Sequence, residues 1–164
     1  PRRFGHLDLF ASDATCKHPL LSGLGVEPLS DAFTDSVLAS LMKGRKTPIK
    51  SALLDQRLIA GLGNIYVSEA LFRAGISPRR KAGTIAGQRA HRLTEAIKVV
   101  LREAINAGGT SLRNHIQPGG EIGYFVQDLR VYGQAGQPCV DCGQGIKQII
   151  QSGRSSFYCS SCQR

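Results

Sequence analysis

The sequence contains no tryptophan, and aromatic residues make up only 6% of its 164 residues. Proteins that hold a single nucleic-acid strand by stacking successive bases need several aromatic side chains, so this content argues against such a site. Long apolar runs are also missing, and the first residues do not have the composition of a signal peptide. We therefore expect no membrane partner. Hydrophobic residues still reach 41%, which is enough for one domain with a small appendage.

Acidic residues are in the minority, with 12 Asp and Glu against 21 Lys and Arg. The net charge is +9 and the sequence pI is about 9.7. A basic excess of this size favours a polyanionic partner, because each neutralised phosphate releases condensed counterions. Solubility alone is the alternative, and the charge by itself does not decide between the two.

The five cysteines are unevenly distributed, since four of them lie in the last 26 residues. A secreted protein with a disulfide framework usually spreads an even number of cysteines along its chain. The pattern instead predicts metal-held thiolates in a reducing compartment, and hence a cytoplasmic or nucleoid location. Cys16 is left over, and we expect it to be an ordinary half-buried thiol.

Two CxxC pairs, Cys139 with Cys142 and Cys159 with Cys162, are separated by sixteen residues. This is a zinc-ribbon spacing, in which each pair sits on a tight turn and directs two thiolates toward the metal. Four protein ligands leave no open coordination position, so the sequence predicts one structural Zn²⁺. Two disulfides or four free thiols are the alternatives.

The residues between the CxxC pairs predict a β-hairpin formed by 146–150 and 153–158. Ile149 and Phe157 are expected to pack toward the metal. Arg154 follows the turn glycine Gly153, which would present its side chain to a partner. A solvated arginine is the alternative interpretation.

The rest of the chain predicts a mainly helical protein, with residues 1–30 irregular or extended. Apolar periodicity and capping residues predict helices over 34–44, 47–61, 64–75 and 87–107. In this prediction Thr47 and Asn64 are N-caps. Two β-prone runs follow at 124–126 and 129–132. The expected domains are a linker at 1–30, a helical domain at 31–132 and a zinc finger at 133–164.

A glycine turn, Gly61-Leu62-Gly63-Asn64, joins two of the expected helices. Free backbone N–H groups at a helix N-terminus, together with an asparagine amide, can bind a phosphate. A plain capping asparagine in a helix hairpin is the alternative. Arg45, Lys46 and Lys50 lie just upstream and could extend the same phosphate-binding surface.

Several strings resemble the C-terminal part of the bacterial formamidopyrimidine-DNA glycosylase family. They occur in the family's order over nearly the whole chain: Arg2-Arg3-Phe4-Gly5, Leu53-Leu54-Asp55-Gln56, Gly61-Leu62-Gly63-Asn64-Ile65-Tyr66, Gly108-Gly109-Thr110-Ser111-Leu112, Val131-Tyr132-Gly133 and the CxxC hairpin. The resemblance implies a helix-two-turns-helix domain followed by a small β-hairpin zinc finger, without the family's N-terminal β-sandwich. The endonuclease VIII family shares the turn and a zinc finger, but it resembles this chain less closely.

The resemblance also implies roles for individual residues. Asn64 and Arg154 would bind the phosphates that flank a flipped base, and Arg154 would also assist the final δ-elimination. Arg2 and Phe4 would fill the gap left by base flipping. Further DNA contacts would come from Arg45, Lys50 and Tyr132. Residues 117–123 would form a lid over the extruded base.

In this family the N-terminal proline of a Pro-Glu start is the nucleophile. Pro1 precedes Arg-Arg-Phe instead, so we expect that it is not the nucleophile and that this chain is the DNA-binding half of a monomeric glycosylase and AP lyase. The expected partners are damaged double-stranded DNA and the N-terminal catalytic domain of the same protein. A stand-alone zinc-ribbon nucleic-acid-binding protein and a protein-interaction module are the alternatives.

Overall fold

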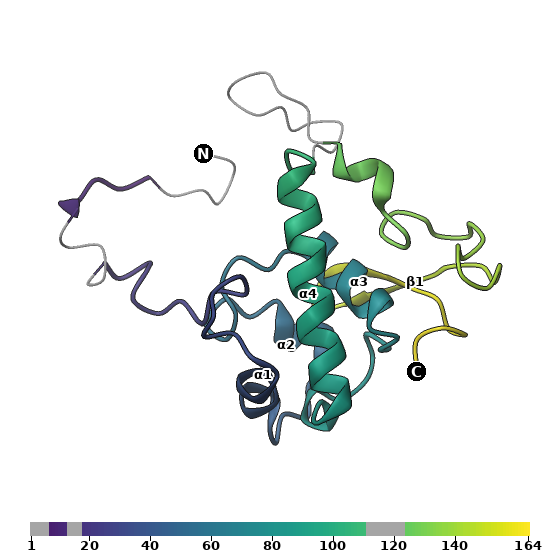
Figure 1. Cartoon of the computed structure of the whole chain (residues 1–164), viewed down its shortest axis with the longest axis horizontal. Coiled ribbons are helices and arrows are strands. Elements are labelled where there is room, and N and C mark those ends of the chain that lie inside the picture. The colour runs from purple at the N-terminus through teal and green to yellow at the C-terminus, as the bar shows by residue number, and fades with distance from the viewer. Residues whose placement is uncertain (1–6, 13–17, 111–123) are drawn as a thin grey trace.

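The computed structural model describes residues 7–12, 18–110 and 124–164, which form a helical body carrying a small antiparallel hairpin (Figure 1). The elements are, in order, α1 Asp35–Met42, α2 Ile49–Leu53, α3 Asn64–Arg73, the 3-10 turn η2 Ala82–Thr84, α4 Gln88–Asn106, the 3-10 turn η3 Phe125–Asp128, β1 Lys147–Gln151 and β2 Arg154–Tyr158. The predicted fold class is confirmed. No helix in the described part of the chain is long and apolar enough to cross a membrane.

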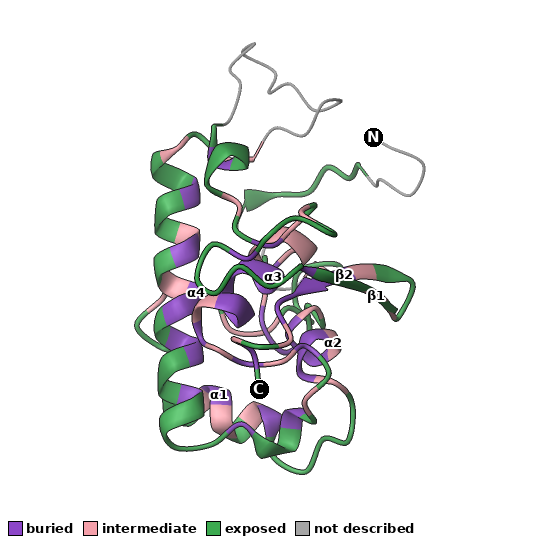
Figure 2. Ribbon diagram, turned by 90° about the vertical axis from the view of Figure 1, so that its right-hand side faces the viewer, coloured by how far each residue is buried: buried purple, intermediate pink, exposed green. Residues whose placement is uncertain are grey.

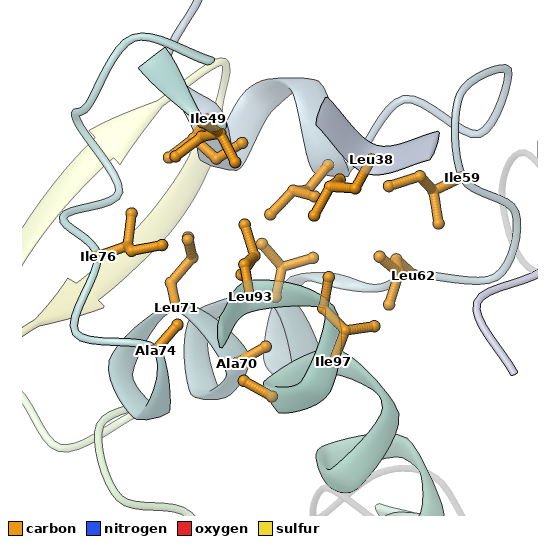
Figure 3. Packing of buried hydrophobic residues seen from close by; sticks show 14 of the residues in the cluster. Leu38, Ile49, Ile59, Leu62, Ala70, Leu71, Ala74, Ile76, Leu93 and Ile97 are labelled. Carbon is orange, nitrogen blue, oxygen red and sulfur yellow. The ribbon is translucent and has the colours of Figure 1, made fainter. Parts of the chain in front are cut away.

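The core of the helical body forms where α4 crosses α1 and α3 (Figure 3). Leu93, Ile97 and Val100 recur at three- and four-residue intervals along α4 and are buried, as the periodicity predicted. Leu38 from α1 and Leu71 from α3 are buried in the same cluster. The α4 boundaries agree with the predicted helix, and Gly108 follows its end with a φ of 71°.

The predicted helix over 47–61 is wrong, because α2 begins after Pro48 and ends at Leu53. A long turn follows it. The Asp55 carboxylate accepts a hydrogen bond from the backbone N–H of Arg57 at 3.0 Å, which offers the backbone an alternative to the helix. The Gln56 side chain then bonds to both ends of the turn: its Nε2 donates to the carbonyls of Leu54 and Leu62, and its Oε1 accepts from the N–H of Gly61.

The β-prone runs at 124–126 and 129–132 do not form a strand. The first enters the 3-10 turn η3. The second lies against the buried carboxylate of Glu69 on α3, which accepts the backbone N–H groups of Arg130, Val131 and Tyr132 at 3.0, 3.0 and 2.8 Å. Because these amides are satisfied by a side chain, the segment needs no neighbouring strand.

The zinc-ribbon hairpin is confirmed, with Gln148 opposite Phe157 and Gln151 opposite Arg154. Its turn places both Ser152 and Gly153 at positive φ, 49° and 72°, as type I′ turns require. The prediction that Ile149 packs toward the metal is wrong. Ile149 is only partly buried, and Ile146 joins Phe157 and the cysteines in the second apolar cluster, because the strand's alternation turns Ile149 away from it.

Candidate nucleic-acid interface and metal centre

The four cysteines of the CxxC pairs converge on one point. Their sulfur atoms all lie within 4.8 Å of one another. The separation is 3.9 Å between Cys139 and Cys162, and 3.5 Å between Cys142 and Cys159. A tetrahedron with Zn–S bonds of about 2.3 Å has edges of about 3.8 Å. The thiols therefore fit one structural Zn²⁺, as predicted, and no position is left for a substrate.

Hydrogen bonds of the Gln144 backbone and the Gln163 side chain support the two zinc knuckles. At the first knuckle, the N–H of Gln144 hydrogen-bonds to the Cys142 sulfur and lowers the pKa of that thiol to about 7, whereas burial raises the pKa of Cys139. At the second knuckle, the side chain of Gln163 is buried. It accepts the N–H of Cys159 at 2.9 Å and donates to the carbonyl of Ile76 at 2.9 Å. Gln163 thus attaches the zinc site to the helical body.

The hairpin meets the helical body again at one carbonyl oxygen, that of Ser155. The Nζ of Lys50 donates to it at 2.6 Å, and the Nδ2 of Asn64 donates to it at 3.1 Å. The same Nζ donates to the Ser156 hydroxyl at 2.7 Å. We call these four residues the hairpin junction. The hydroxyls of Ser51 and Ser152 add a contact between α2 and the hairpin turn at 3.1 Å.

Lys50 is only 1% exposed. Burial, with a smaller contribution from the positive charge of Arg154, lowers the pKa of Lys50 to about 8. Its ammonium donates to two groups of the hairpin. The DNA contact predicted for Lys50 stays a prediction. Its distances instead describe a cation that holds β2 against α2.

Asn64 is the first residue of α3, and Gly63 is the N-cap. The prediction that Asn64 caps this helix is wrong because its amide reaches the hairpin, 91 residues away, instead of its own backbone. Its Oδ1 is buried and has no hydrogen-bond partner among the described residues. The first turn of α3 has no side-chain cap, and α3 is in contact with β2.

The other predicted contact residues lie around the junction or outside the described residues. Arg154 is exposed at the start of β2, one residue before Ser155. The ring of Tyr132 meets that of Phe157 edge-on, with centroids 5.0 Å apart. The Nε of Arg45 donates to the Leu41 carbonyl. Arg2, Phe4, Cys16 and the lid at 117–123 lie outside the described residues.

Sequence reasoning missed three buried polar residues that shape this region: Glu69, Ser156 and Gln163. Glu69 lies in a helical pattern and resembles a surface residue, and its three partners are more than sixty positions away. Gln163 sits beside a metal ligand, which could have suggested a role in the knuckle. No pattern in the sequence indicates the partner of Ser156.

Two family models match the chain: the formamidopyrimidine-DNA glycosylase H2TH domain over residues 24–115, and the zinc finger found in FPG and IleRS over residues 136–164. The formamidopyrimidine-DNA glycosylase of Acidiphilium cryptum is 57% identical over 169 residues, covering 100% of this chain and 62% of the relative. This chain therefore spans about three fifths of that relative's length.

Solved structures show the same architecture. The crystal structure of MutM (Fpg) from Thermus thermophilus matches with a TM-score of 0.85 and 43% identity, covering 93% of this chain and 57% of that one. The Lactococcus lactis Fpg in complex with DNA containing an abasic site matches with a TM-score of 0.86 and 33% identity, covering 94% and 57%. With more than half of its residues matched by the H2TH model, this chain belongs to the formamidopyrimidine-DNA glycosylase H2TH domain family.

Proposed function

We propose that this chain is the DNA-binding half of a base-excision-repair glycosylase and AP lyase that removes oxidised purines such as 8-oxoguanine and formamidopyrimidines. One observation carries the proposal: the hairpin junction brings the start of α3, with Asn64, next to exposed Arg154 on β2. Two groups from distant parts of the sequence, each suited to binding a phosphate, thereby lie close together. Support also comes from the Lactococcus lactis relative, whose structure contains DNA with an abasic site.

The chemistry of the two groups differs. Asn64 has a second N–H on Nδ2 and stands beside the free N–H groups of the α3 N-terminus, which favour a phosphate oxygen. Arg154 offers a planar guanidinium with several donors, suited to bidentate phosphate binding. Together they would hold a backbone that is kinked around an extruded nucleotide.

Zinc has a structural part in this function. When bound, it fixes the two knuckles from which the hairpin emerges, because the appendage is too small to bury a core of its own. Lys50 and Ser156 then set the position of β2 against α2. Arg154 is therefore oriented from both ends of its strand.

The covalent chemistry belongs to the proposal for the whole protein. From the resemblance to the family, we expect the proline nucleophile in an N-terminal domain and a part for Arg154 in δ-elimination. We infer that this chain alone binds DNA without cleaving it, and that the whole protein acts as a monomer in the cytoplasm. Covalent trapping of this chain on lesion DNA by borohydride would contradict that inference.

The test is a titration of the zinc-loaded chain with a duplex carrying an abasic-site analogue and with the undamaged duplex. Asn64→Ala and Arg154→Ala should each weaken binding to the analogue by about 10- to 150-fold, because a charge-assisted hydrogen bond contributes about 1.5–3 kcal/mol. Arg102→Ala, on the exposed face of α4, is the matched control. A protein-interaction module would show the same weak DNA binding in all four proteins.

The same titration separates the proposal from a stand-alone zinc-ribbon binding protein. Such a protein would bind damaged and undamaged duplexes equally. The proposed function requires a preference for the abasic analogue that disappears when a chelator removes zinc.

A further inference from the structure

A hollow of about 470 Å³ lies beside the loop that follows α3, and its lining is strongly basic. Arg79, Arg80, Lys81 and Arg164 line it with Ser77 and Thr84, and no acidic side chain is among the lining residues. The ion pairs formed by the described residues involve none of these four cations. The Nε of Arg80 donates to the backbone oxygen of Arg164 at 3.2 Å. Among the described residues, the side-chain ion pairs leave the guanidinium and ammonium groups of the hollow without an Asp or Glu partner.

A second basic stretch runs alongside this loop. Pro48 and Lys81 form an isolated antiparallel bridge. The N–H of Ala82 donates to the carbonyl of Thr47 at 2.9 Å, and the N–H of Gly83 donates to that of Arg45 at 2.9 Å. These bonds put Arg45 and Lys46 beside the hollow. We call the five residues Arg45, Lys46, Arg79, Arg80 and Lys81 the basic loop cluster.

Backbone hydrogen bonds hold the basic loop cluster together despite its like charges. The carbonyl of Arg80 accepts the N–H of Ile49 at 2.7 Å. The backbone of Gly83 approaches that of Arg45 so closely that an added Cβ would stand 3.0 Å from the Arg45 carbonyl oxygen, a tight contact. Gathering five cations costs electrostatic free energy unless an anion compensates. This arrangement is what a polyanion-binding surface requires.

The basic loop cluster is close to the proposed lesion-binding residues. Gln151 is the strand partner of Arg154, and its Nε2 donates to the Pro78 carbonyl at 3.2 Å. Arg79 is the next residue. One strand spacing, one glutamine side chain and one residue step add up to at most roughly 17 Å between the Cα atoms of Arg154 and Arg79. This corresponds to at most about five base-pair steps along a duplex axis.

We infer that the basic loop cluster binds backbone phosphates of the DNA arm beyond the lesion, within about five base pairs of the phosphates held by Asn64 and Arg154. The inference rests on the proposed function, and it extends the DNA site from the lesion to a flanking arm. The contacts would be to phosphates alone, so they would add affinity and orientation without reading sequence.

Duplex length and salt dependence test this inference. The double variant Arg79→Ser/Lys81→Ser removes two exposed charges and no residue of the hairpin junction. The matched control is Arg92→Ser/Arg102→Ser on α4, which lies on the opposite side of the molecule from the hairpin (Figure 2). Each protein is titrated with abasic-analogue duplexes whose arms are about four or about twelve base pairs long.

Each phosphate contact contributes about 0.9 to the slope of log K against log salt concentration, or about eightfold in affinity at 0.1 M salt. On long arms, the slope of log K against log salt concentration should therefore be about 1.8 smaller in magnitude for the Arg79→Ser/Lys81→Ser variant. Its affinity should fall by up to about 60-fold. On short arms it should bind like the unmodified chain. Lys81→Glu should weaken long-arm binding further than Lys81→Ser.

Equal long-arm affinities and slopes for Arg79→Ser/Lys81→Ser and for the α4 control would overturn the inference, and would leave the hollow to a partner other than DNA. The proposed function fails by a different result, in which the unmodified chain does not prefer the abasic analogue. Zinc content and thermal unfolding of each variant show that the charges were removed without loss of the fold.

Discussion

Replacing Lys50 by methionine tests the hairpin junction most directly. The pKa of Lys50 is lowered from 10.5 to about 8 by burial. Each pKa unit corresponds to about 1.36 kcal/mol, so the charged side chain costs the folded protein about 3 kcal/mol near pH 7. Lys50→Met removes that cost and keeps the aliphatic stem. It also leaves the Ser156 hydroxyl and part of the Ser155 carbonyl without a donor, which costs about 1–3 kcal/mol.

The two contributions nearly cancel, so we expect the free energy of unfolding at pH 7 to change by less than about 2 kcal/mol. The pH dependence should change clearly. Between the folded pKa of about 8 and the unfolded value of 10.5, the unfolded chain binds more protons at Lys50 than the folded one. The contribution of Lys50 to the free energy of unfolding therefore rises with pH. Between pH 7 and pH 9, the free energy of unfolding of the unmodified chain should increase by about 1 kcal/mol relative to that of Lys50→Met.

Denaturant unfolding of both proteins at pH 7, 8 and 9 measures this difference, in which contributions from other titrating groups cancel. In parallel, Lys50→Met should weaken binding to the abasic-analogue duplex at pH 7, because β2 loses the cation that orients Arg154. Parallel stability curves over this pH range, combined with unchanged DNA affinity, would refute the role given to Lys50.

Two further predictions concern the connections around the zinc module. Glu69→Gln should lower the free energy of unfolding by about 2–4 kcal/mol, because a neutral amide cannot accept all three backbone N–H groups, and an unchanged denaturation midpoint would contradict this. Acidification should release one equivalent of Zn²⁺ as the thiolates are protonated, so that stability from the metal is lost as pH falls, and a zinc-indicator dye measures it. Chelation should leave most of the far-ultraviolet helical signal, because the larger apolar cluster contains no cysteine. A full loss of helix would show that the two clusters fold as one.

The parts of the fold that could be predicted are those with local causes. The α4 helix follows from an apolar repeat ended by glycines, and the metal site follows from the spacing of four cysteines. Both patterns carry their explanation within a short window of sequence. For the same reason the hairpin between the cysteines was placed nearly to the residue.

The errors at Asn64, at 129–132 and at Lys50 came from side chains whose partners are distant in sequence. Asn64 has the residue type and position of an N-cap, but a carbonyl 91 residues away takes its amide. The run 129–132 has strand-forming residues, but Glu69 satisfies its backbone. Lys50 has the sequence context of a surface cation, although it is buried under the hairpin. Local propensity cannot reveal such contacts, because tertiary structure supplies the competing partner.

The position of Phe72 has a mechanical consequence. It lies on α3, yet it packs in the small cluster with Val131 and the cysteines, while its neighbour Leu71 packs in the large cluster. A single ten-residue helix is therefore common to both cores. A movement of the hairpin relative to the helical body would disturb the packing of Phe72, and with it the packing of α3 against α4. We therefore expect the hairpin and the helical body to move together, because a displacement of either one would disturb the packing of α3 in both clusters.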